Sequence, residues 1–147
     1  MNTKGTYALI LHLEKDTGIR VGKLGFFEFK KGYYIYVGSA FGPGGLSARI
    51  KHHSRSSENP HWHIDYFRRF ASLVNVWVCA SDARFEHTWA GRLERTNKSL
   101  CIAKGFGSSD CSCTTHFFYL QKKPMQKIIE RYFPEAVQYE PRRRKGR

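Results

Sequence analysis

Residues 6–13 read TYALILHL, a compact apolar run, and the turn-forming residues KDTG follow it directly at 15–18. An apolar run of this length that ends in a turn is typical of a buried β-strand. Residues 19–29 alternate imperfectly around two glycines, and after a turn at 30–32 the aromatic and β-branched residues YYIYV occupy 33–37. Side chains of these kinds favour extended structure. We therefore predict three antiparallel strands joined as a meander.

The remainder of the chain alternates between helical and extended patterns. Beyond the glycine-rich break at 42–45, Leu46 and Ile50 lie four residues apart, as they would on one side of a helix. The further predicted elements are a short helix near 62–70, a strand at 73–78, a helix with Phe85, Trp89 and Leu93 on its buried side, a strand at 116–120 and a last helix after Pro124. The predicted fold class is α+β, with a small central antiparallel sheet of three or slightly more strands flanked by helices.

The length and composition indicate a single domain. A chain of 147 residues has the size of one domain, and we place that domain at residues 1–141 with a basic, disordered tail at 142–147. Four cysteines are too few for a secreted disulfide framework. No apolar stretch approaches the ~20 residues of a membrane span, so we expect a cytoplasmic protein with no membrane partner.

The charge of the chain is strongly positive. Lysine and arginine total 25 against 12 acidic residues, and taking away the five cations of 142–147 lowers the net charge only from +13 to +8. Such a surface favours a polyanion, since basic side chains replace the counterions condensed on phosphates. We predict a nucleic-acid partner, with DNA favoured over RNA. A basic surface that is merely solvated is the alternative.

Two short signatures and three later residues carry the chemistry. Gly5-Thr6-Tyr7 opens the first predicted strand, and Tyr36-Val37-Gly38 closes the third. Arg49 and His53 lie four residues apart on the following helix, and Glu86 lies on a later one. This ordered set resembles the GIY-YIG endonucleases. The segments GSA at 38–40, GGL at 44–46, HWHIDY at 61–66 and GFGSSDC at 105–111 resemble the stand-alone Uri branch of that superfamily, and the likeness extends over residues 5–120.

The resemblance implies a metal-dependent endonuclease that hydrolyses phosphodiester bonds in DNA, in repair or in defence. Its catalytic residues would be Tyr7, Tyr36, Arg49, His53 and Glu86. The two tyrosines stand 29 positions apart, further than in compact members of the superfamily, which is explained if residues 14–31 form an inserted strand and its turns and leave both tyrosines in one sheet. Ser39 stands where some relatives carry lysine.

Elementary chemistry assigns this set a coherent task. Glu86 would anchor one divalent cation, Mg²⁺ or Mn²⁺, because a carboxylate and several waters suit a hard ion. Arg49 offers a permanently charged planar fork to a phosphate. Tyr7 or Tyr36 would accept a proton from water once nearby cations lower its pKa, or His53 would relay that proton itself. Each residue also has an ordinary structural interpretation, as a packed aromatic or a surface charge.

Other residues suggest additional or competing roles. Predicted nucleic-acid contacts are Lys51, Arg55, Arg68, Arg69, Arg142, Arg143 and Arg144. A zinc-binding interaction module built on Cys111, Cys113 and His116, with His61 and His63 available, is disfavoured because Cys-x-Cys is tighter than the usual ligand spacing. A non-catalytic nucleic-acid-binding domain of the same fold is the other alternative. Asp65 would orient a histidine or form a salt bridge. Asn97 is either a polar site residue or a helix cap. The sequence leaves the oligomeric state open.

Overall fold

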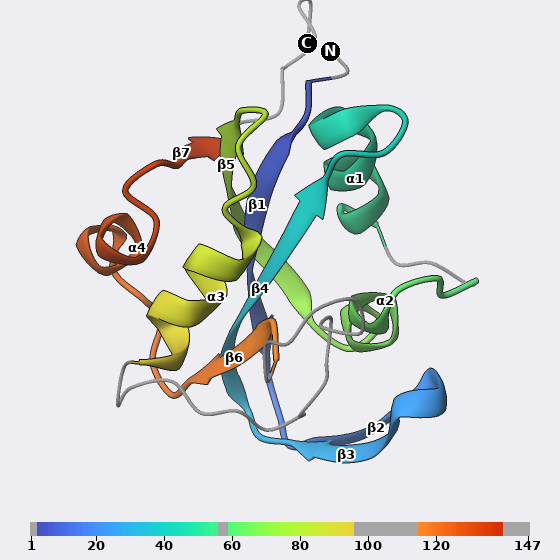
Figure 1. Cartoon of the computed structure of the whole chain (residues 1–147). Helices are drawn as coiled ribbons and strands as arrows, with labels where there is room; N and C mark the ends of the chain where they lie inside the picture. The colour runs from blue at the N-terminus through green and yellow to red at the C-terminus, as the bar shows by residue number, and fades with distance from the viewer. Residues whose placement is uncertain (1–2, 56–58, 96–114, 140–147) are drawn as a thin grey trace, which may run out of the picture.

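The central layer is a five-stranded antiparallel sheet in the order β6-β4-β1-β5-β7, with helices on both of its faces (Figure 1). The computed structural model describes residues 3–55, 59–95 and 115–139. Within those ranges the strands are β1 (Gly5–Leu13), β2 (Thr17–Val21), β3 (Gly25–Phe29), β4 (Gly32–Ala40), β5 (Ser72–Ala80), β6 (Phe117–Leu120) and β7 (Val137–Tyr139), and the helices are α1 (Gly45–His53), α2 (His63–Arg68), α3 (Glu86–Glu94) and α4 (Gln126–Tyr132). The α+β class agrees with the prediction, although the sheet is larger.

The predicted three-strand meander is wrong in its middle strand. β1 pairs directly with β4, from Gly5 opposite Ala40 to Leu13 opposite Gly32. The segment between them folds back on itself as a separate hairpin of β2 and β3. Gly22 and Gly25 cause this reversal with φ angles of 49° and 127°, in a region that favours glycine. Residues 14–31 are inserted between the paired strands, but they form two strands where one was predicted.

Each face of the sheet covers its own buried core. Along β1, Tyr7, Leu9 and Leu11 point to the face covered by α1, α2 and the hairpin, whereas Ala8 and Ile10 point to the face covered by α3 and α4. Because successive strand residues alternate between faces, a strand covered on both sides is apolar throughout. This accounts for the unbroken apolar run at 6–13. Among the helices described, none combines the length and apolar character that crossing a bilayer requires.

Candidate active site

The two signature tyrosines lie on the same face of the sheet. Tyr7 of β1 is opposite Gly38 of β4, and Leu9 is opposite Tyr36, so the two phenols are diagonal neighbours. Their ring centroids are 6.3 Å apart. Both side chains are buried, with exposed fractions of 1% for Tyr7 and 6% for Tyr36. Residues 29 positions apart in the sequence therefore meet in one centre.

Gly38 leaves the space that the Tyr7 ring occupies. A Cβ atom at position 38 would lie 2.5 Å from Cζ and 2.6 Å from the hydroxyl oxygen of Tyr7. The glycine of the second signature therefore has a packing role. Gly5 of the first signature is similarly confined, since a Cβ there would collide with the Cys79 carbonyl oxygen and with Leu46.

Gly38→Ala is expected to push the Tyr7 ring aside and to lower the free energy of unfolding by about 1–3 kcal/mol, the usual cost of overpacking a core. Chemical denaturation of the purified variant measures the loss. Gly42→Ala is the matched control, because a Cβ at position 42 meets no atom within 4 Å. Equal stability of the two variants would contradict the packing role.

His53 is the direct partner of Tyr7. The Tyr7 hydroxyl forms a hydrogen bond of 2.8 Å with Nε2 of His53, which the last turn of α1 directs into the core. His53 is 1% exposed, and its ring centroid lies 5.3 Å from that of Tyr7 and 6.2 Å from that of Tyr36. Burial lowers the pKa of His53 to about 3. The imidazole is therefore neutral at physiological pH.

Burial and neighbouring charges change the pKa of both phenols. Burial raises the pKa of Tyr7 to about 12, with a further increase from Glu86 and an opposing decrease from Arg49. Burial also raises the pKa of Tyr36 well above its ordinary value, and the same two charges act there in the same directions. Both phenols are protonated in the free protein. Any gain of positive charge nearby would favour their ionisation.

Arg49 is held beside the phenols by two contacts. Its Nη1 donates a 2.8 Å hydrogen bond to the carbonyl oxygen of Ser39 at the end of β4. Its guanidinium carbon lies 4.2 Å from the centroid of the Trp62 ring. Stacking on an aromatic face fixes the guanidinium plane and leaves other donors available to a planar oxyanion. Arg49 is half-buried, which suits a phosphate contact at the edge of the core.

Glu86 opens α3 on the other face of the sheet, beside the end of β4. The buried hydroxyl oxygen of Thr6 accepts a 3.2 Å bond from the backbone N–H of Phe85, which fixes the start of the helix. Oε2 of Glu86 lies 3.0 Å from Nδ1 of His116. Burial alone would raise the pKa of Glu86, but hydrogen bonds from His116 and Ser39 bring it below its ordinary value. The carboxylate is therefore ionised, and its negative charge raises the pKa of both phenols.

The Glu86 carboxylate suits a hard divalent ion. It is ionised and its side chain is 23% exposed, so a hydrated ion can approach it from solvent. Mg²⁺ commonly binds through one or two carboxylates while keeping several waters. The donor set therefore fits the predicted Mg²⁺ or Mn²⁺.

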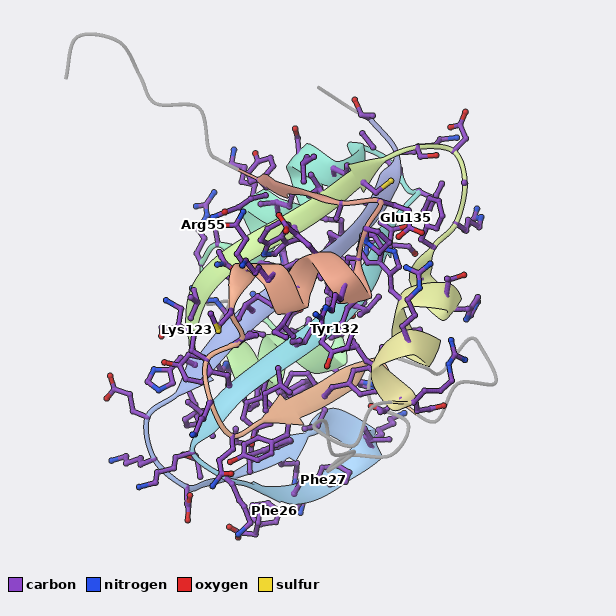
Figure 2. The ribbon with its side chains drawn as sticks, turned by 90° about the vertical axis from the view of Figure 1, so that its left-hand side faces the viewer. Phe26, Phe27, Arg55, Lys123, Tyr132 and Glu135 are labelled. Atoms are coloured by element: carbon purple, nitrogen blue, oxygen red, sulfur yellow. The ribbon has the colours of Figure 1, made fainter. Side chains whose placement is uncertain are left out.

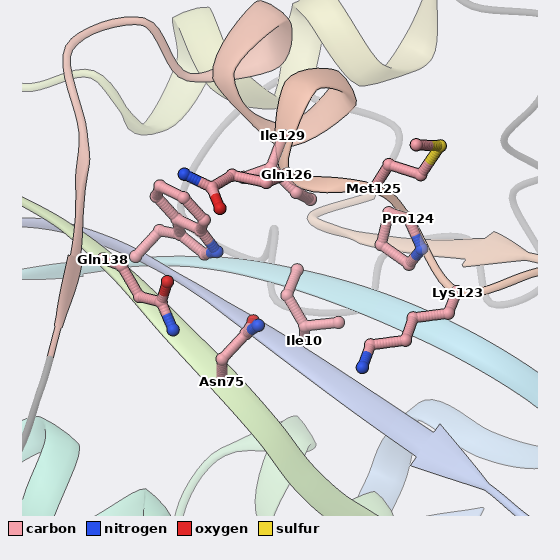
Figure 3. Close-up of a pocket in the computed structure, with 9 residues that line it drawn as sticks. Ile10, Asn75, Lys123, Pro124, Met125, Gln126, Ile129 and Gln138 are labelled. Atoms are coloured by element: carbon pink, nitrogen blue, oxygen red, sulfur yellow. The ribbon is translucent and has the colours of Figure 1, made fainter.

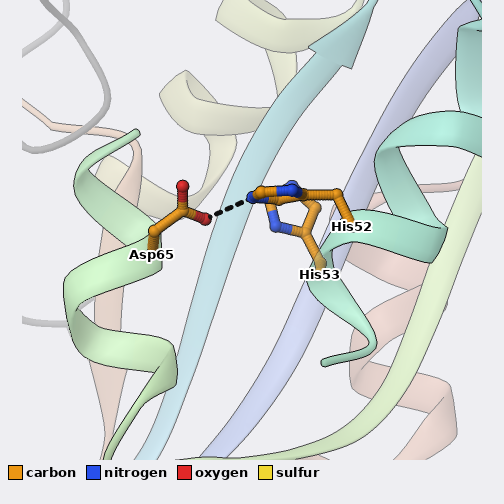
Figure 4. Close-up of side chains that lie close together, drawn as sticks. All are labelled: His52, His53 and Asp65. Atoms are coloured by element: carbon orange, nitrogen blue, oxygen red, sulfur yellow. Dashed lines mark hydrogen bonds and ion pairs between the residues drawn. The ribbon is translucent and has the colours of Figure 1, made fainter. Parts of the chain in front are cut away.

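A second group of polar side chains joins α1 to α2 (Figure 4). Oδ1 of Asp65 lies 2.8 Å from Nε2 of His52, while Oδ2 accepts backbone N–H bonds of 2.7 Å from His61 and 2.9 Å from Trp62. His52, His53 and Asp65 place one ligand-type atom each within 4.8 Å of one another. Two ligands of one tetrahedral ion at ~2.0–2.1 Å would be about 3.3 Å apart, so the 2.8 Å contact is a hydrogen bond instead. Asp65 thus braces the two helices that carry Arg49, His53 and Trp62.

The predicted basic contacts divide into two kinds. Lys51, Arg55 and Arg69 are exposed. Arg68 differs from the prediction, because it donates to the carbonyl oxygens of His53 at 2.9 Å, Ala71 at 2.7 Å and Ser54 at 3.3 Å. The bonds to His53 and Ser54 satisfy carbonyls at the C-terminal end of α1, so Arg68 has a structural role. Arg142, Arg143 and Arg144 lie outside the described residues.

Several site residues were missing from the sequence prediction. Thr6, Ser39 and Trp62 belonged to quoted motifs, yet nothing in their spacing indicated that they position Glu86 and Arg49. His52 was also missed as the partner of Asp65. His116, considered above only as a zinc ligand, contacts Glu86. Asn97, Cys111 and Cys113 lie outside the described residues.

The buried, neutral His53 makes stability depend on pH. Its pKa is about 3 in the folded protein, against about 6.5 in the unfolded chain, so below pH 6.5 protons bind preferentially to the unfolded state. The free energy of unfolding is expected to fall by about 2 kcal/mol between pH 7 and pH 5 from this residue alone. Urea denaturation at pH 7, 6 and 5 measures that loss.

His53→Gln should remove this loss, because glutamine can hydrogen-bond Tyr7 but does not titrate. The exposed His87→Gln is the control and should keep the wild-type loss, since His53 stays in place. Parallel stability curves for His53→Gln and wild type would show that His53 does not carry the effect.

Comparison with known proteins gives one family match. No curated protein matched the chain, and no solved structure did. The family model described as a domain of unknown function, DUF123, matches residues 6–138. That range includes Tyr7, Tyr36, Arg49, His53 and Glu86. Because the match covers most of the sequence, the chain belongs to the DUF123 family.

Proposed function

We propose that this protein is a metal-dependent endonuclease that hydrolyses phosphodiester bonds in DNA. The observation that carries the proposal is the buried 2.8 Å hydrogen bond between Tyr7 and His53, beside Arg49 and within reach of the charge of Glu86. A phenol paired with a neutral imidazole can transfer a proton, a fixed guanidinium can stabilise charge on a phosphate, and an ionised carboxylate can hold a divalent ion, so together these groups can support phosphodiester hydrolysis. The excess of basic residues favours the polyanionic substrate.

Arg49 binds the scissile phosphate in this proposal. Its guanidinium is already oriented by Trp62 and Ser39, so little conformational entropy is lost when it contacts nonbridging oxygens. Its fixed charge stabilises the negative charge that grows on those oxygens during attack.

Tyr7 and His53 together accept the proton of the attacking water in this proposal. As a water attacks phosphorus, its proton passes to the Tyr7 oxygen while the Tyr7 proton passes to Nε2 of His53. In the free protein the low pKa of His53 opposes this transfer. Binding of a negatively charged phosphate beside the pair favours the protonated imidazole, so substrate binding promotes the transfer.

Glu86 is the residue that would hold Mg²⁺ or Mn²⁺. The ion supplies positive charge that stabilises the phosphate oxygens and the leaving oxygen. The carboxylate also acts on the phenols, because its negative charge raises the pKa of Tyr7 and of Tyr36. Neutralising that charge lowers the pKa of Tyr7 and so favours loss of its proton to Nε2 of His53.

A cleavage assay tests the proposal. Purified protein is incubated with end-labelled single-stranded, duplex and branched DNA, and with RNA of the same sequences, in the presence of Mg²⁺, Mn²⁺ or excess EDTA. Cleavage of DNA that EDTA abolishes is the expected result. If every substrate is bound and none is cut under any condition, the chain is a non-catalytic nucleic-acid-binding domain and the proposal fails.

A further inference from the structure

A pocket of about 400 Å³ lies between the sheet and α4. Ile10 and Trp77 belong to the core under α3 and α4, so the pocket is on the opposite face of the sheet from Tyr7 and Tyr36. We call this space the α4 pocket. The helix faces the viewer in Figure 2, with Lys123 shortly before its first turn. The volume is within the range of small-molecule sites, ~300–1,000 Å³.

Two buried polar atoms in the pocket wall have unused hydrogen-bonding capacity. Nε1 of Trp77 and Oδ1 of Asn75 are out of contact with bulk water, and neither has a hydrogen-bond partner among the residues that the structure describes. Trp77 is 4% exposed. By contrast, Nε1 of Trp89 on the same face donates to Glu135 at 2.9 Å. Buried polar groups in native proteins are nearly always paired with protein, water or a ligand, so an unpaired donor and acceptor together show that this wall can bind a polar molecule.

The rest of the lining defines what kind of ligand fits. In Figure 3 the amide groups of Asn75, Gln126 and Gln138 face the same space, and the Lys123 side chain extends along it. Each amide offers both a donor and an acceptor, as the edge of a nucleobase does. Ile10 supplies an apolar surface for a flat ring. Lys123 supplies a cation for a phosphate.

We propose that the α4 pocket binds an unpaired nucleotide, with the edge of its base against Asn75 and Trp77 and its phosphate at Lys123. The base must be unpaired, because pairing would occupy the edge that the amides read. Because the two buried wall atoms are out of contact with bulk water, the base reaches them only if a neighbouring side chain moves, and Gln126 and Gln138 both line the pocket and are exposed. The proposal rests on the proposed function for the class of polymer, and it adds a contact to a single-stranded part of the substrate.

The indole N–H resonance of Trp77 gives a direct test that requires no cleavage. The three tryptophan indole signals of ¹⁵N-labelled full-length protein are assigned with single Trp→Phe variants. The four deoxynucleoside 5′-monophosphates, their nucleosides and inorganic phosphate are then titrated in turn up to about 10 mM, enough to detect millimolar binding. At least one nucleotide is expected to shift the Trp77 signal in a saturable manner, more strongly than its nucleoside.

Exposed residues of the rim supply variants that should fold normally. Lys123→Gln is expected to weaken nucleotide binding about tenfold and to leave nucleoside binding unchanged. Gln138→Ala is expected to weaken both. Lys122→Gln is the matched control, because Lys122 is exposed and adjacent but does not line the pocket.

Four outcomes would overturn the pocket proposal. They are no shift of the Trp77 signal with any nucleotide, an equal shift with phosphate alone, a shift of the Trp62 signal alone, and equal effects of the Lys122 and Lys123 variants. Failure of the nuclease proposal is distinguishable from these. Saturable binding at Trp77 by a protein that cuts no substrate would support the pocket and reject the enzyme.

Discussion

Replacing Glu86 with glutamine is expected to lower the rate of DNA cleavage about a thousandfold or more. Glutamine keeps the size of the side chain but removes the negative charge that would hold the divalent ion. Loss of roughly 4 kcal/mol of transition-state stabilisation by that ion corresponds to about three powers of ten in rate. The measurement is the single-turnover cleavage rate in Mg²⁺ or Mn²⁺, together with Mn²⁺ binding by titration calorimetry.

Two comparisons separate chemistry from folding in this variant. Glu94→Gln changes an exposed carboxylate in the last turn of the same helix, and it should cleave and bind Mn²⁺ as wild type does. Thermal denaturation shows whether loss of the Glu86 contact with His116 unfolds the chain. Glu86→Gln protein that cuts at the wild-type rate would rule out the metal-binding role of this residue.

Tyr7→Phe is expected to reduce cleavage by about 10²–10⁴-fold, the usual contribution of a group that transfers a proton in the transition state. The substitution keeps the ring that packs beside Gly38 and Tyr36 and removes only the hydroxyl. It also leaves Nε2 of His53 unpaired in the core, which should lower the free energy of unfolding by about 1–3 kcal/mol. Single-turnover kinetics and urea denaturation measure the two effects on one preparation.

Tyr34→Phe is the matched control for this substitution. Tyr34 is buried on the same face of the sheet, and its hydroxyl donates a 2.6 Å bond to the carbonyl oxygen of Lys30. Both variants therefore lose one hydroxyl hydrogen bond, but only Tyr7 belongs to the candidate site. Similar cleavage rates in the two variants would show that the Tyr7 hydroxyl supports the fold and not the reaction.

The two signatures occur together because a residue of the first packs against a residue of the second. Tyr7 fills the space that Gly38 leaves open, and Thr6 on the opposite face holds the start of α3, where Glu86 lies. Two adjacent residues of β1 thus have different roles, since Tyr7 packs against Gly38 and Thr6 places the carboxylate. A single strand connects the two faces of the candidate site.

The pattern of single elements was predictable from the sequence. The apolar runs of β1 and β4, the spacing of Leu46 and Ile50 on α1, and the stripe of Trp89 and Leu93 on α3 all agree with the structure. These features follow from the repeat of two residues in a strand and 3.6 in a helix. The hairpin at 17–29 was predicted as a single strand because its period was imperfect, and the three-residue β7 was too short to leave a pattern.

The sequence by itself identified the candidate site residues, and it determined which faces of their elements they occupy because strand and helix periodicities are local properties of the backbone. The tertiary structure alone decided their partners. Tyr7 and His53 are 46 positions apart, and their hydrogen bond exists only because α1 docks across the strand pair. The contacts of Glu86 with His116 and of Asp65 with His52 have the same origin. Such contacts depend on how separate elements pack together, which no local pattern specifies.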